Sequence, residues 1–172
     1  MQRRKKIIEI QNAFFALSET APVEQITIQK ICETAGIARN TFYSYYDNMD
    51  DLRCDLEHMI TVPLLELLDQ NPDLWEDEQA LVKVFRYTQE NEQKIHLLYF
   101  AENSGLDKRM RLPVERHLRQ YLQSHRIECS ETKLFFIVSP FMHVVVSSTN
   151  WPQQSPESIA KEVCGCVGKL LS

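Results

Sequence analysis

The sequence has little glycine, and it lacks any long apolar run. Only four of the 172 residues are glycine, and the apolar residues recur at helical spacing over long stretches, which favours an all-α fold. No uninterrupted apolar run approaches the roughly 20 residues of a membrane span. Residues 1–15 are basic and then apolar, but Glu9, Gln11 and Asn12 interrupt them and no small-residue cleavage site follows. We therefore expect a cytoplasmic protein with no membrane partner.

The sequence also lacks the motifs of metal sites and of common enzymes. Its five cysteines are scattered, and an odd, scattered set does not indicate a disulfide framework. Cys164 and Cys166 are the only close pair, and no second Cys or His pair stands at zinc-ligand spacing. A glycine-rich phosphate loop, a nucleophile elbow and a zinc-hydrolase motif are all missing from the sequence. We expect no enzyme activity, no cofactor and no metal.

The charge is divided unevenly along the chain. The formal net charge is −5, which argues against indiscriminate binding to nucleic acid. Residues 1–46 carry six basic and four acidic side chains, whereas residues 47–172 carry 13 basic and 20 acidic ones. A polyanionic partner is therefore expected to meet the first part of the chain.

The hydrophobic pattern predicts about nine helices. They are expected over residues 3–19, 28–35, 39–46, 50–68, 76–91, 93–102, 107–125, 131–149 and 156–171. Pro63 is expected to kink the fourth of these. We predict a helix-turn-helix domain over residues 1–48 and a helical ligand-binding and dimerisation domain over residues 49–172.

The second and third helices have the spacing of a helix-turn-helix. Thr27 can cap the second helix, and Gly36 can end it in the left-handed conformation that a β-carbon disfavours. In the third helix Phe42 and Tyr46 lie four residues apart and are expected to face inward. The second helix of such a unit can lie in the major groove of DNA.

The residues on the other faces of this unit are of types that suit DNA. Arg and Asn side chains can bond base edges or phosphates, a Thr methyl can contact thymine, and Tyr hydroxyls can donate to phosphate oxygens. The predicted DNA-binding residues are Thr27, Arg39, Asn40, Thr41, Tyr43 and Tyr45.

Residues 7–52 resemble the DNA-binding front of the TetR/AcrR family of transcriptional regulators. The resemblance rests on TIQKICETAGI at residues 27–37, TFYSYY at 41–46 and DDL at 50–52. It implies a homodimer on a near-palindromic operator in double-stranded DNA, paired through the last two helices, with an unknown small-molecule effector bound in the body. Repression is the commonest mode in the family and is the mode expected, although the residues themselves favour neither repression nor activation.

Four residues depart from the family pattern. Met49 stands where a phosphate-binding Lys is usual, and Ala38 stands where a small polar cap is usual. Asp47 and Asp50 add negative charge near the DNA face. Losing one phosphate contact reduces the salt dependence of binding by about one unit, and the basic residues 3–6 can compensate. An alternative is a regulator or co-activator of the same fold whose head binds a protein partner in place of DNA.

Residue types alone suggest which body side chains line an effector pocket. Aromatic, Met and His side chains are common in such pockets, although at helical spacing they more often belong to a core. The candidates are His96, Tyr99, Phe100, Met110, His117, Tyr121, Phe136, Met142 and His143.

Overall fold

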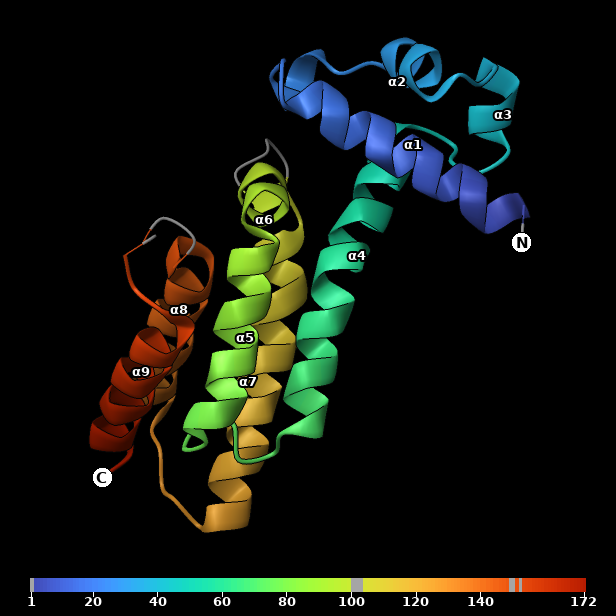
Figure 1. Ribbon diagram of the computed structural model, residues 1–172. Helices are drawn as coiled ribbons and strands as arrows, with labels where there is room; N and C mark the ends of the chain where they lie inside the picture. The colour runs from blue at the N-terminus through green and yellow to red at the C-terminus, as the bar shows by residue number, and fades with distance from the viewer. Residues whose placement is uncertain (1, 100–103, 149–150, 152) are drawn as a thin grey trace.

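The computed structural model describes residues 2–99, 104–148, 151 and 153–172, and all regular structure in these ranges is helical (Figure 1). This confirms the all-α expectation. The helices are α1 (Gln2–Ser18), the 3-10 turn η1 (Val23–Gln25), α2 (Ile28–Ala35), α3 (Arg39–Tyr43), α4 (Met49–Gln70), α5 (Glu78–Glu90), α6 (Glu92–Tyr99), α7 (Leu106–His125), α8 (Glu131–Ser147) and α9 (Pro156–Leu171).

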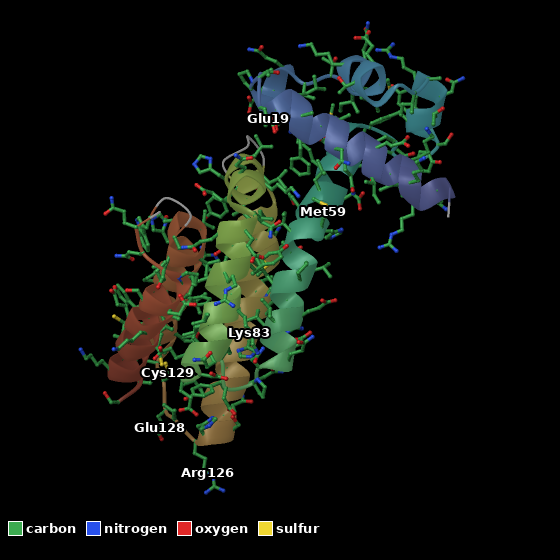
Figure 2. All side chains as sticks on the ribbon, viewed as in Figure 1. Glu19, Met59, Lys83, Arg126, Glu128 and Cys129 are labelled. Carbon is green, nitrogen blue, oxygen red and sulfur yellow. The ribbon has the colours of Figure 1, made fainter. Side chains whose placement is uncertain are left out.

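The molecule consists of a small head on one end of an elongated helical body. Helices α1, α2 and α3 form the head, and α4 runs from beneath it along the body (Figure 1). Helices α5 to α7 lie beside α4, and α8 and α9 lie on the side away from it. Arg126, just past the end of α7, marks the end of the body opposite the head (Figure 2). None of the described helices combines the length and the apolar character that a membrane crossing requires.

Side-chain caps explain why most helix boundaries could be predicted. The Thr27 hydroxyl accepts a hydrogen bond from the Lys30 N–H at 3.3 Å, and Ser155 caps α9 by accepting from the Ser158 N–H at 3.2 Å. Such caps satisfy backbone donors that have no partner inside the helix. Helix α4 continues through Pro63 to Gln70, and the kink expected at Pro63 stays a prediction.

Helix α3 is shorter than predicted, ending at Tyr43 and not at residue 46. The Ser44 hydroxyl donates to the Asn40 carbonyl at 2.8 Å and competes for the helical acceptor. The N–H groups of residues 45 and 46 both bond to the Phe42 carbonyl, at 2.9 and 3.1 Å, which closes the helix in a tight turn. Two of the predicted helices, 93–102 and 131–149, end beyond the described residues.

The buried side chains form two clusters. One fills the body between α4, α5, α7, α8 and α9. The other fills the head, and it also contains Leu52, Leu56 and Ile60 of α4 with Ile95 and Leu98 of α6. The head is therefore packed directly on two helices of the body, and α4 belongs to both clusters.

Candidate nucleic-acid interface

The turn between α2 and α3 sets the angle of the helix-turn-helix. Gly36 has a φ of 63°, in the left-handed region, and its N–H bonds to the Glu33 carbonyl at 3.3 Å. The Ile37 N–H bonds to the Cys32 carbonyl at 2.9 Å, so two of the last carbonyl groups of α2 are satisfied. The chain leaves α2 in a fixed direction, and α3 lies across it.

Two aromatic side chains hold α3 on the head. Phe42 is completely buried and Tyr46 is buried, as their spacing predicts. Their ring centroids lie 5.6 Å apart, within the range of favourable aromatic pairs. A helix of five residues is far too short to be stable alone, so this packing positions α3.

The Tyr46 hydroxyl links the turn after α3 to α4 and, through a shared carboxylate, to α1. It donates to Asp55 Oδ2 of α4 at 2.5 Å, and Gln11 Nε2 of α1 donates to the same oxygen at 3.0 Å. Burial, together with the neighbouring Asp55 carboxylate, raises the pKa of Tyr46 well above its usual range. The phenol therefore stays protonated, and the bond to Asp55 persists at any physiological pH.

The opposite side of α3 is open to solvent. Arg39 and Asn40 are exposed, and neither side chain forms a hydrogen bond or ion pair with a described residue. Tyr43 is 52% exposed, and its ring edge rests on Phe42 with centroids 5.7 Å apart. The structure therefore brings these three predicted residues onto one accessible surface.

The other three predicted DNA-binding residues are less available to a partner, because they are half-buried or already hydrogen-bonded. Thr27 is exposed at the start of α2, but its hydroxyl oxygen already serves as a helix cap. Thr41 and Tyr45 are half-buried, and Tyr45 packs against the head cluster. Lys30, also on α2, donates from Nζ to the Gln25 carbonyl at 3.1 Å.

At the start of α1, three basic side chains are exposed and a fourth forms an ion pair. Arg3, Arg4 and Lys5 are exposed, whereas Lys6 forms an ion pair with Glu9 at 2.7 Å. This pair lowers the pKa of the Glu9 carboxyl, because the ammonium of Lys6 bonds to the carboxylate.

The acidic turn before α4 has a structural role. The Asn48 side chain caps α4 by accepting from the Asp51 N–H at 2.9 Å, and Asp51 Oδ2 accepts from the Asp47 N–H at 3.1 Å. This reciprocal arrangement resembles a capping box. Met49 is half-buried against the head cluster, while Asp47 and Asp50 are exposed. The Asp50 carboxylate lies 4.0 Å from Arg53 Nη1 in a long ion pair, so Asp47 is the exposed acid of this turn that has no ionic partner among the described residues.

The structure does not bring the proposed pocket residues together. Tyr99, Met110 and Met142 line an enclosed cavity of about 20 Å³, which is enough for about one water molecule. Phe136 and His143 are exposed on α8. Phe100 lies outside the described residues.

His117 and Tyr121 lie at the far end of α7, in a hydrogen-bonded group around Trp75. Trp75 Nε1 donates to His117 Nδ1 at 3.0 Å, and His117 Nε2 lies 3.1 Å from the Asn71 carbonyl. Because the indole nitrogen can only donate, His117 Nδ1 must be the accepting nitrogen. Burial lowers the pKa of His117. The Tyr121 hydroxyl donates to Glu76 at 3.0 Å.

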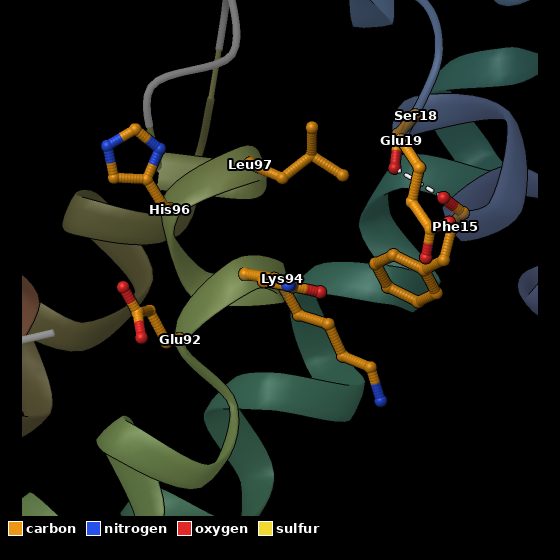
Figure 3. Close-up of a pocket in the computed structure, with 8 residues that line it drawn as sticks. Phe15, Ser18, Glu19, Glu92, Lys94, His96 and Leu97 are labelled. Carbon is orange, nitrogen blue, oxygen red and sulfur yellow. Dashed lines mark hydrogen bonds between the residues drawn. The ribbon is translucent and has the colours of Figure 1, made fainter.

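A larger cleft lies where the head meets the body. It has a volume of about 600 Å³ and lies between the end of α1 and helix α6 (Figure 3). Phe15 of α1, Glu19 just past the end of α1 and His96 of α6 line it. Lys94 Nζ lies 5.3 Å from the centre of the Phe15 ring, a cation–π contact across the junction.

One group of described residues has donor atoms close enough to share a cation. Oxygen atoms of Asp73 and Glu76 and a nitrogen of His125 all lie within 4.8 Å of one another, on exposed side chains. His125 Nε2 lies 3.7 Å from Asp73 Oδ1 and 3.6 Å from Glu76 Oε1. The expectation that the chain binds no metal stays a prediction.

Over the residues that the structure describes, a helix-turn-helix head stands on a body of six helices, and solved structures of TetR-family transcriptional regulators have a similar fold. A TetR regulator from Streptococcus agalactiae has 24% identity, covers 96% of this chain and 95% of its own, and superposes with a TM-score of 0.68. A TetR-family regulator from Haemophilus influenzae has 18% identity, covers 99% and 98% of the two chains, and has a TM-score of 0.61. The fold that the resemblance in residues 7–52 implies is thereby confirmed: the chain has the TetR-family fold.

A curated relative is also similar in sequence. It is described as the HTH-type dhaKLM operon transcriptional activator DhaS of Lactococcus lactis, and it is 32% identical over 104 residues, or 57% of this chain. The match spans 54% of the relative, so about half of its length is compared. A solved structure described as a dihydroxyacetone kinase operon activator DhaS has 21% identity, covers 96% of each chain and has a TM-score of 0.64. No protein-family model matches the chain.

Proposed function

We propose that the protein is a ligand-responsive transcriptional regulator that binds double-stranded DNA through α3. The observation that carries this is the division of α3 into two sides. Phe42 anchors one side, while Arg39, Asn40 and Tyr43 are exposed on the other. A cation, an amide and a phenol supply contacts to base edges and to phosphates. Thr27, Thr41 and Tyr45 complete the proposed DNA face at its margin.

We further propose a homodimer formed through α8 and α9. An apolar groove of about 250 Å³ runs between these helices. On it Phe136 is 61% exposed, Leu170 39% and Trp151 38%. Large apolar side chains gathered on one face are typical of an interface. Two copies related by a two-fold axis would place their α3 helices on a near-palindromic operator, about one or more DNA turns apart.

The effector is proposed to act on the contact between head and body. Residues 1–48 form the head in this scheme and residues 49–172 the body. The cleft beside His96 has a volume of about 600 Å³, whereas the cavity inside the body core has about 20 Å³. A small molecule therefore finds room at the junction of α1 and α6, where a bound ligand changes the position of the head most directly.

The test is selection from a random DNA pool at low and near-physiological salt, followed by sequencing of the retained DNA. We expect an enriched motif of two half-sites that survives moderate salt. Asn40→Ala should relax base preference at one position, and Tyr43→Phe should weaken binding to all sequences. Gln120→Ala, on the exposed side of α7, is the control and should change neither. No enriched motif from folded, dimeric protein would contradict the proposal.

A second candidate is a head that binds a protein partner. The exposed carboxylates of Asp47 and Asp50, and Met49 in place of a phosphate-binding Lys, favour this alternative. If the head binds a protein in place of DNA, the Asp47→Asn and Asp50→Asn variants should still show no DNA binding. Under the DNA-binding proposal the same changes strengthen DNA binding, because they remove repulsion from phosphates.

The direction of control is tested with a reporter gene behind the selected operator. The sequence resemblance implies repression, whereas the description of the relative from Lactococcus lactis favours activation. A cytoplasmic location and the lack of an enzyme activity belong to the same proposal. Both are supported by the similarity to transcriptional regulators.

A further inference from the structure

Helix α7 carries five basic side chains between residues 108 and 119, and two of them have no ionic partner among the described residues. The ion pairs are Arg109 with Glu57 at 2.7 Å, Arg111 with Asp107 at 3.0 Å, and Arg119 with Glu115 at 2.8 Å and with Glu131 at 2.6 Å. The remaining two cations are Lys108 and Arg116, which are both exposed. They stand on a body domain whose overall charge is negative.

The two unpaired cations line the same groove, and Leu112 lies between them. The groove has a volume of about 620 Å³ and is open to solvent on the outer side of α7. Its lining residues are Gly105, Lys108, Arg109, Leu112, Pro113 and Arg116. Leu112 is 65% exposed, the largest exposure of any large apolar side chain in the described ranges.

The spacing of Lys108, Leu112 and Arg116 limits which kinds of partner can contact all three side chains at once. Positions four apart lie along one side of a helix, so Lys108, Leu112 and Arg116 form a line about 12 Å long at a rise of about 1.5 Å per residue. A small anion does not span this distance. A nucleic-acid backbone supplies charge at such a spacing but no apolar group for Leu112. A second helix with carboxylates at the same spacing and an apolar residue midway satisfies all three.

We propose that this groove docks an acidic amphipathic helix of a partner protein. The carboxylates of the partner pair with Lys108 and Arg116, and its central apolar side chain covers Leu112. Burial of the leucine supplies affinity, while the charges set the register and direct the encounter. The groove lies on α7, not on α3 or on the α8–α9 face. Docking is therefore independent of the proposed DNA binding and dimerisation.

The probe is a dye-labelled alanine-based helical peptide of about 20 residues, long enough to be helical in water. It carries two Glu residues at the spacing of Lys108 and Arg116, with Leu midway. Fluorescence anisotropy with the full chain should show saturable binding. The double variant Lys108→Glu with Arg116→Glu should raise the Kd at least about tenfold. Leu112→Ser should weaken binding without changing its dependence on salt.

The control is the double variant Lys83→Glu with Arg126→Glu, which makes the same change of charge on α5 and just past the end of α7. Figure 2 labels Lys83, which projects from α5 and is exposed. The control should leave the Kd unchanged. A peptide with Lys in place of Glu should bind the Lys108→Glu, Arg116→Glu variant and not the original chain. This rescue also shows that the variant is folded.

Three results would overturn the proposal. The first is no saturable binding of the acidic peptide up to millimolar concentration. The second is an equal loss of affinity in the control variant, which would indicate an effect of total charge. The third is binding of a non-specific DNA duplex that depends on Lys108 and Arg116 while peptide binding does not, which would assign the groove to nucleic acid.

Discussion

Replacing Phe42 by Ala tests whether the buried aromatic residues of the head hold α3 in place. The ring is completely buried and packs on the rings of Tyr43 and Tyr46 at centroid distances of 5.7 and 5.6 Å. Truncating such a residue costs about 3–5 kcal/mol, from lost burial and from the cavity that remains. For a chain of this size each kcal/mol lowers the Tm by about 2–4 °C, so we expect a fall of about 6–20 °C. Thermal denaturation followed by circular dichroism measures it.

The matched variant is Tyr43→Phe, one residue along the same helix. It keeps the edge contact with Phe42 and removes only a hydroxyl from a ring that is 52% exposed. The free energy of unfolding should change by less than about 0.5 kcal/mol. DNA affinity should fall about tenfold, because a hydrogen bond to a charged phosphate is lost.

The comparison of the two variants can refute the reasoning. If Tyr43→Phe lowers the Tm as much as Phe42→Ala does, the exposed ring is a structural residue. If Phe42→Ala leaves the Tm unchanged, α3 is not held by its buried side. Either result would contradict the proposal that α3 has one buried side that anchors it and one exposed side that contacts DNA.

Three further predictions concern the stability of the fold. His117 has a pKa lowered by burial and accepts a hydrogen bond from Trp75, so protonation favours the unfolded state, whose His pKa is about 6.5. Thermal stability should be full above about pH 6.5 and decline as the pH falls below it, and His117→Gln should flatten this profile. Gly36→Ala should cost about 1–2 kcal/mol in chemical denaturation, because its φ of 63° strains any residue with a β-carbon, although no atom lies within 4 Å of the added group. Glu57→Gln should cost about 2 kcal/mol, measured in the same way, because the buried Glu57 carboxylate accepts from Arg109 at 2.7 Å and solvent screens only part of that pair.

The head was predictable because its signals are local. Thr27 caps α2 and Gly36 ends it, and these positions follow from the chemistry of one or two residues. The end of α3 was not predictable from periodicity. It depends on the Ser44 hydroxyl and on the bond between Tyr46 and Asp55, which lies nine residues further along the chain.

The body shows the opposite situation, because its features depend on contacts between distant residues. Met110 and Met142 have the residue types of a ligand pocket, but both are buried beside a cavity of only about 20 Å³. Whether such side chains line a pocket depends on the distances between α4, α5 and α8. No local sequence pattern indicates these distances. The bond between Trp75 and His117 joins residues 42 positions apart and had no sequence signal.

The packing of the head also bears on how the proposed effector acts. Ile95 and Leu98 of α6 lie in the same buried cluster as Phe14 of α1 and Phe42 of α3. A displacement of α6 therefore disturbs the apolar packing that orients α3, and it does so without any need for a flexible linker. Moving one such side chain out of contact costs a few kcal/mol at most, which is within the differential binding energy of a small ligand. The shared cluster thus supplies a physical route from the proposed effector cleft beside Lys94 to the proposed DNA face.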